Sequence, residues 1–171
     1  MHSIKIEISE SVKNHFSQLT ANAGHTLNQQ AINQSLLKIE MISKDCQDDS
    51  LLSHLVDLKS MIEMMNEPHW QVSSDKAQRI NAALGYFLNE DDMIPDSTPG
   101  LGYLDDCIVI NNTKEYLHHE LNDFIDFQNT QRIYGKNKCL NQDDWKKIKH
   151  QESASRLRHR RTKFARKNRH W

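Results

Sequence analysis

The sequence contains few residues that break helices or form crosslinks. Its 171 residues include 3 prolines, 5 glycines and 3 cysteines. Cysteines that are few, odd in number and widely separated exclude the disulfide framework of a small secreted domain, so we expect a reduced cytoplasmic setting. No run of about 18 consecutive apolar residues occurs, which argues against a membrane span. The N-terminal MHSIKIEIS also lacks the apolar core of a secretory signal.

Motifs of common catalytic chemistry are missing as well. There is no glycine-rich phosphate loop and no G-x-S-x-G elbow, so hydrolase and kinase chemistry has no support in the sequence. His118 and His119 precede Glu120, but Asp123 stands where a second helical histidine would complete a zinc motif. We interpret these histidines as surface residues and favour a protein that is not an enzyme.

Charge is present in abundance but is divided along the chain. The formal net charge is −1. Residues 145–171 carry 11 Lys and Arg and a single acid, Glu152, which gives +10. Residues 1–144 carry the other 11 Lys and Arg and 22 acids, which gives −11. A basic terminal segment on an acidic body is typical of an interaction tail.

The stretch Asn89 to Asp106 organises the rest of the chain. It holds two of the three prolines and two of the five glycines, and helical apolar spacing flanks it on both sides. Pro95 predicts an end to the helix that covers residues 77–88, because proline has no backbone donor and restricts the residue before it. Asp105 or Asp106 is placed to cap the next helix.

Residues 92–106 of this stretch have the sequence DMIPDSTPGLGYLDD. This motif resembles the signature of the YkvA family, a bacterial domain of unknown function. The resemblance covers residues 50–128 and implies a helical domain of about four helices without established chemistry. The sequence departs from the family where Glu90 replaces a proline and Ser97-Thr98 replaces Phe-Ile. These changes make the loop more polar, which argues against a membrane-embedded version.

The carboxylates of this stretch have two interpretations. They can cap helices and bond to turn backbone, which we favour. They can instead hold a divalent cation such as Mg²⁺, Mn²⁺ or Ca²⁺, although their spacing matches no EF-hand. The candidate ligands of the metal interpretation are Asp92, Asp96, Asp105 and Asp106.

The N-terminal segment, residues 1–43, is expected to contain a strand and two helices. Ile4, Ile6 and Ile8 alternate with polar residues, which predicts a short strand, and Thr26 or Asn28 begins the second helix. The pattern at residues 3–42 is similar to a ribbon–helix–helix module, which implies a homodimer paired through residues 4–8. Its outward strand residues include Glu7, which is unfavourable near phosphates.

Further helices are expected in the central domain. Lys44 to Ser50 reads as a polar linker, with Ser50 capping the next helix and Pro68 ending it. The cluster Met61, Met64 and Met65 is either an adaptable binding face or core, and we favour core. After Asp106 we expect a helix with a break near Asn111-Asn112, followed by a polar linker at residues 132–144.

The basic arm, residues 145–171, fits three kinds of partner. It can bind RNA or DNA phosphates, with aromatics such as Trp145 available to stack on bases. It can lie on an anionic membrane, or dock on an acidic protein surface, its own included. The candidate nucleic-acid-binding residues are Lys146, Lys147, Arg156, Arg158, Arg160, Arg161, Lys163, Arg166, Lys167 and Arg169.

The sequence therefore predicts a mainly α-helical protein with a YkvA-like domain, an N-terminal strand with two helices, and a basic C-terminal helix or arm. The leading hypothesis is a non-enzymatic cytoplasmic binding or adaptor protein whose arm contacts nucleic acid or a ribonucleoprotein, without a cofactor. One alternative is a metal-dependent enzyme that uses the Asp cluster. Another is a protein-interaction module whose arm docks on an acidic protein. Neither the partner nor the oligomeric state follows from the sequence.

Overall fold

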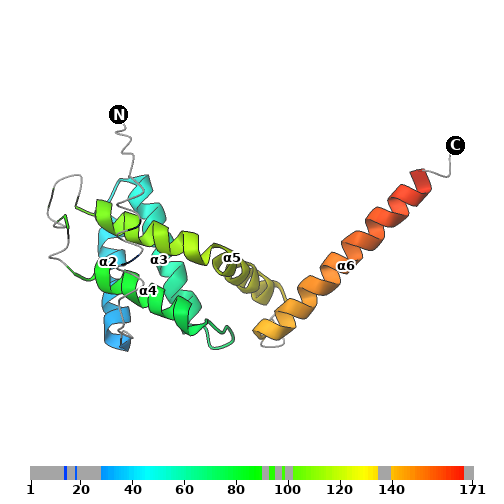
Figure 1. The fold of residues 1–171 in the computed structure, drawn as a ribbon, viewed down its shortest axis with the longest axis horizontal. Helices are drawn as coiled ribbons and strands as arrows, with labels where there is room; N and C mark the ends of the chain where they lie inside the picture. The colour runs from blue at the N-terminus through cyan, green and yellow to red at the C-terminus, as the bar shows by residue number, and fades with distance from the viewer. Residues whose placement is uncertain are drawn as a thin grey trace. The chain divides into compact units, whose positions relative to one another are not determined.

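In the computed structural model of the chain, every regular element that is described is an α-helix (Figure 1). It describes residues 28–89, 93–94, 98, 102–134 and 140–167 with the isolated positions 14 and 18, and only the backbone of residues 159–167. The helices in these ranges are α2 (Gln29–Asp45), α3 (Asp49–Asn66), α4 (Ser74–Phe87), α5 (Leu104–Tyr134) and α6 (Gln142–Lys167).

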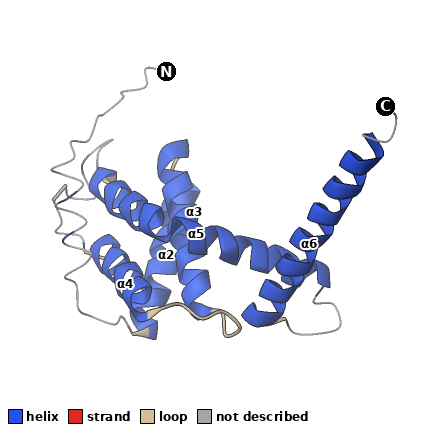
Figure 2. Ribbon diagram, turned by 45° about the vertical axis from the view of Figure 1, so that its right-hand side comes forward, coloured by secondary structure: helices blue, strands red, loops and turns tan. Residues whose placement is uncertain are grey.

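The mainly α class is confirmed for this part of the chain. Within the described ranges there is no strand (Figure 2). The strand and the dimer contact predicted for residues 4–8 lie outside the described residues and stay predictions. Among the described helices, none is long and apolar enough to cross a membrane.

The described residues divide into two compact units. The first holds α2, α3, α4 and the start of α5 through Asn122. The second holds residues 68–71, the remainder of α5 from Asp123, and α6.

Helix ends in the first unit follow local capping chemistry. Asn28 caps α2, one of the two residues predicted, and its side chain accepts from the Ala31 N–H at 2.9 Å. The predicted cap Ser50 is wrong for α3. Asp48 has the extended backbone of a cap, and its carboxylate accepts from the Ser50 N–H at 2.8 Å, so Ser50 is already inside the helix. α3 ends just before Pro68, as predicted.

The core of the first unit lies where α2, α3 and α4 pack against one another. Its fully buried side chains come mainly from α3 and α4, and include Leu58, Met61, Met64, Leu84 and Phe87. The burial of Met61 and Met64 confirms that these methionines are core residues rather than an exposed binding face.

The predicted break in α5 near Asn111-Asn112 is wrong, because the helix runs from Leu104 to Tyr134. The polar residues in this region bond within the helix itself. The Asn111 amide donates to the Glu115 carboxylate at 3.0 Å, and the buried Thr113 hydroxyl donates to the Val109 carbonyl at 2.9 Å. With no glycine or proline present, nothing at this point stops the helix.

Polar contacts tie the helices of the first unit together. Lys38 of α2 donates to the Phe87 carbonyl at the end of α4, where a cation also complements the helix dipole. Lys114 of α5 pairs with Asp57 of α3 at 2.7 Å. These contacts fix each neighbouring helix at a defined position along its length.

Two methionines of this unit allow a controlled test of the core. Met64 is 0% exposed and Met41 is 61% exposed, and both lie in helices. Met64→Ala removes packed atoms and leaves a cavity, so we expect a loss of about 2–5 kcal/mol in the free energy of unfolding. Met41→Ala should change it by less than about 0.5 kcal/mol. Urea unfolding measures both, and equal losses would contradict the assignment of Met64 to the core.

Candidate functional site

A buried carboxylate holds the loop of the central motif. Asp105, in the first turn of α5, is 1% exposed. Its Oδ2 accepts from the Tyr86 hydroxyl at 2.9 Å and from the Ile94 N–H at 3.0 Å, and its Oδ1 accepts from the Asp106 N–H at 3.1 Å. Leu104 and Tyr86 pack beside it against a cluster that contains Ala83. One side chain thus joins the end of α4, the loop and the start of α5.

The four predicted metal ligands have different outcomes. Asp92 and Asp96 lie outside the described residues, and Asp106 is 1% exposed in the first turn of α5. Both oxygens of Asp105 accept hydrogen bonds from protein donors, which is the capping and turn role favoured for these carboxylates. In the part of the chain that is described, no three His, Cys, Asp or Glu side chains form a group suited to a metal ion. The four-carboxylate site remains a prediction.

Cys107 follows these carboxylates and is half-buried. Burial raises the pKa of its thiol to about 12, and the negative charge of Asp106 adds to this effect. The thiol therefore stays protonated at neutral pH, and a protonated thiol is a poor nucleophile.

His118 and His119 are exposed on α5, as predicted for surface histidines. Their rings stack with centroids 5.4 Å apart. The His118 Nδ1 lies 2.8 Å from the Asn122 amide nitrogen, one turn further along the same helix. These contacts are local to α5 and bring no acidic ligand to the pair.

The first turn of α6 packs on a group of aromatic rings in the second unit. Trp145 is 6% exposed and packs edge-to-face on Trp70, with ring centroids 5.5 Å apart. The Trp70 ring also packs against the rings of Phe124 and Phe127 of α5, with centroid distances of 5.5 and 5.2 Å. Buried aromatic pairs of this kind contribute both apolar burial and a preferred geometry.

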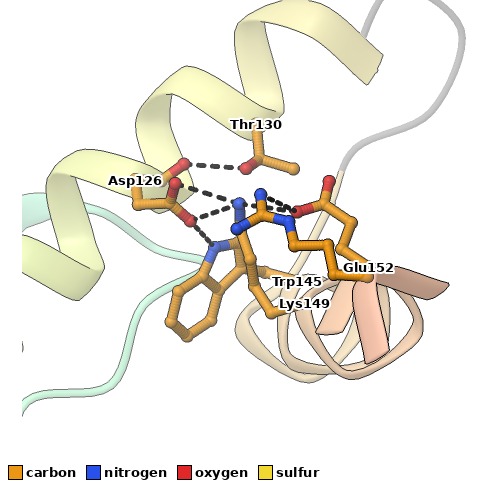
Figure 3. Close-up of polar contacts among 6 residues, drawn as sticks. Asp126, Thr130, Trp145, Lys149 and Glu152 are labelled. Carbon is orange, nitrogen blue, oxygen red and sulfur yellow. Dashed lines mark hydrogen bonds and ion pairs between the residues drawn. The ribbon is translucent and has the colours of Figure 1, made fainter. Parts of the chain in front are cut away.

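Asp126 of α5 joins α6 to this group through polar contacts (Figure 3). Its carboxylate accepts from the Trp145 indole N–H at 2.7 Å. Lys149, one turn further along α6, approaches both carboxylate oxygens, at 3.0 and 2.8 Å. Glu152 continues the chain of charges, 3.5 Å from Lys149 and 3.9 Å from Arg156.

These contacts change the acid–base behaviour of the ion pair. Partial burial opposes ionisation of Asp126, but the hydrogen bonds from Lys149 and Trp145 outweigh it, so the pKa of Asp126 lies below its ordinary value of 3.8. The hydrogen bond to Asp126 raises the pKa of Lys149 above 10.5. Both groups are therefore charged throughout the neutral range.

This arrangement corrects one expectation about the arm. Trp145 was predicted to be available for stacking on bases, but its ring is buried and its N–H is bonded to Asp126. The spacing of Trp145 and Lys149 places both on one face of a helix. Their acceptor lies 19 residues before Trp145 and across a polar loop, so no local pattern in the sequence indicates it.

α6 consists of a neutral base and a basic outer half. We define the base as residues 142–153, which contain three lysines and three acids and so have no net charge. Each of these lysines has an acidic partner, including Lys146 with Asp143 at 4.0 Å and Lys147 with Asp144 at 3.6 Å. The outer half, residues 154–171, contains eight Lys and Arg and no acid, which gives +8.

The predicted nucleic-acid-binding residues are distributed over both parts. Lys146 and Lys147 are exposed in the base, and Arg156 and Arg158 are exposed in the outer half. The following members lie on the described backbone of α6, although their side chains are outside the description: Arg160, Arg161, Lys163, Arg166 and Lys167. Arg169 lies beyond the described residues.

The motif held by Asp105 matches a known family model. Residues 79–111 match the model described as "Protein of unknown function (DUF1232)". The match takes in most of α4, the loop and the first two turns of α5. The YkvA-like domain predicted from the central motif is consistent with it. Neither a search of curated proteins nor a search of solved structures found a significant match.

Asp105 provides a test of how the matched motif is held together. Asp105→Ala leaves the Tyr86 hydroxyl and the Ile94 N–H without their acceptor, so we expect a loss of about 2–4 kcal/mol in the free energy of unfolding. Tyr86→Phe removes one donor together with its bond and should cost about 1 kcal/mol. Urea unfolding measures both. A stable Asp105→Ala variant would show that the loop does not depend on this carboxylate.

The Asp126–Lys149 pair should make the stability of the protein depend on pH. The pKa of Asp126 is lower in the folded state than in the unfolded state. Its contribution to the free energy of unfolding is therefore fully present above about pH 3.8 and is lost as the pH falls through the lower folded-state pKa. Because the pKa of Lys149 is raised, Lys149 stays charged and the ion pair stays intact up to at least pH 10.5. Since these side chains are partly exposed, solvent screening limits the charge contribution to about 1 kcal/mol or less.

The variant Asp126→Asn keeps an acceptor for Trp145 but removes the charge that Lys149 needs. We expect its stability deficit to be constant between about pH 5 and 9 and to shrink below about pH 4. Asp123→Asn, on the same helix at an exposed position, is the control and should show little deficit at any pH. Urea unfolding across this pH series makes the comparison, and a deficit that grows in acid would exclude the ion pair as its origin.

Proposed function

We propose that the protein is a non-enzymatic cytoplasmic binding protein that attaches to nucleic acid, free or within a ribonucleoprotein, through the outer half of α6. The observation that carries this proposal is the distribution of charge along that helix. Eight cationic residues follow Ala154 with no acid among them, whereas the base before them is neutral. Phosphates attract such a segment because binding releases the counterions condensed on the nucleic acid.

The exposure of the described side chains in the outer half supports this proposal. Residues 155–158 are all exposed, and Arg156 and Arg158 are among them. Glu152 lies 3.9 Å from Arg156. An exposed pair at this separation holds its arginine weakly, so a phosphate can replace the carboxylate.

The base has a different role in this proposal. Trp145 and Lys149 are committed to Asp126. The ion pairs of Lys146 and Lys147 are as loose as that of Arg156, but the acids of the base cancel its positive charge. The base then fixes the helix to α5, and the outer half makes the phosphate contacts. Of the predicted binding residues, those from Arg156 onward should contribute most of the affinity.

The test compares two sets of charge removals in the full-length protein by fluorescence polarisation with labelled DNA and RNA. We expect the quadruple variant Arg156→Gln, Arg158→Gln, Arg160→Gln and Arg161→Gln to weaken binding at least about tenfold. It should also lower the slope of log affinity against log salt by about four. The control variant Lys146→Gln with Lys147→Gln should have a much smaller effect, because these lysines belong to the neutral base.

Two outcomes of this titration would overturn the proposal. Equal losses of affinity in the two variants would mean that the division of α6 into a base and an outer half does not matter for binding. No binding by the wild-type protein to either nucleic acid would point to an acidic protein surface as the partner of the arm. Residues 1–144, with a net charge of −11, are one candidate for such a surface.

A further inference from the structure

We infer that the ligand of the outer half of α6 is B-form duplex DNA, with the helix lying in the major groove between the two phosphate strands. This inference rests on the proposed function and names the class of nucleic acid. It starts from the exposure of the helix. Residues 155–158 are consecutive and all exposed, and four successive residues point to every side of an α-helix. At this level no described neighbour covers any face, so the helix is accessible all round.

Six of the eight basic residues of the outer half fall into two rows on the helical backbone, and Arg166 lies between the rows on the side opposite positions 157 and 164. Each residue advances about 100° around the axis. Positions 156, 160, 163 and 167 follow the spacing i, i+4, i+7, i+11 and share one face, and all four are Arg or Lys. Positions 158 and 161 are arginines with i, i+3 spacing on roughly the opposite face. A helix with cations on two opposed faces suits a ligand that presents phosphates on both sides.

A duplex groove has this geometry. The major groove of B-form DNA is about 12 Å wide, and an α-helix with its side chains is about 10–12 Å across. Residues 156–167 extend about 17 Å along the axis, which is roughly half a turn of the duplex. Positions 157 and 164, Leu and Phe, lie on the strip between the two rows, and Leu157 is 54% exposed. Apolar residues at such positions suit the thymine methyl groups in the groove.

Other nucleic acids fit these observations less well. A single strand presents one row of phosphates, which would leave one of the two cationic faces without a partner. The major groove of duplex RNA is too deep and narrow for a helix to enter. An anionic membrane needs a wide apolar face, and the strip between the rows holds only Leu157 and Phe164.

The experiment measures the affinity of the full-length protein for three labelled probes of one sequence: duplex DNA of about 20 base pairs, the same DNA as a single strand, and the RNA duplex. Duplex DNA should bind at least about tenfold more tightly than either alternative. Vesicles containing phosphatidylserine serve as a fourth probe. Circular dichroism confirms that every variant retains its helix content.

Two matched double variants then test the rows. Arg156→Gln with Lys163→Gln removes two charges from the first face, and Arg158→Gln with Arg161→Gln removes two from the opposite face. In a groove both faces meet phosphates, so each variant should weaken duplex binding and lower the salt slope by about two.

The possible failures are distinguishable. Tighter binding to single strands or to duplex RNA, or an effect of only one row, would overturn the groove inference and leave nucleic-acid attachment standing. Binding to none of the nucleic acids, with or without binding to vesicles, would overturn both.

Discussion

The function proposed for α6 depends on the carboxylate of Asp126. It accepts from the Trp145 indole and pairs with Lys149, and through these contacts the first turns of a highly charged helix become part of a packed unit. Because Asp126 is only half-buried, its charge keeps contact with water and is not costly to hold there. The aromatic rings provide apolar burial, and Asp126 contacts Trp145 and Lys149 on the same face of α6.

α5 uses the same chemistry near both of its ends, once in each unit. Asp105 in its first turn accepts from the hydroxyl of Tyr86, and Asp126 accepts from the indole N–H of Trp145. In each case an aromatic residue, partly buried for Tyr86 and buried for Trp145, presents its polar hydrogen to an aspartate. The consequences differ with burial. Asp105 is 1% exposed and organises a loop, whereas the more accessible Asp126 also recruits a lysine and so responds to pH.

The sequence was informative where structure is decided by neighbours along the chain. Asn28 as a cap, Pro68 as a helix end and the buried methionines of α3 all follow from short patterns. It failed where two chemically suitable residues compete, as at Asp48 and Ser50, because backbone conformation then decides which one caps. The sequence also did not predict the contacts of Asp126, because its partners lie beyond a loop. No local pattern indicates which of the 23 acidic residues pairs with a given lysine.

The opposite charges of the two parts of the chain bear on how a duplex would be held. Residues 1–144 carry −11 and repel phosphates, whereas residues 145–171 carry +10. Repulsion from the body favours poses in which DNA meets only the outer half of α6, which limits the number of phosphate contacts to about eight. Affinity from so few contacts falls by orders of magnitude over a modest rise in salt. The attachment proposed for α6 is therefore reversible and sensitive to salt.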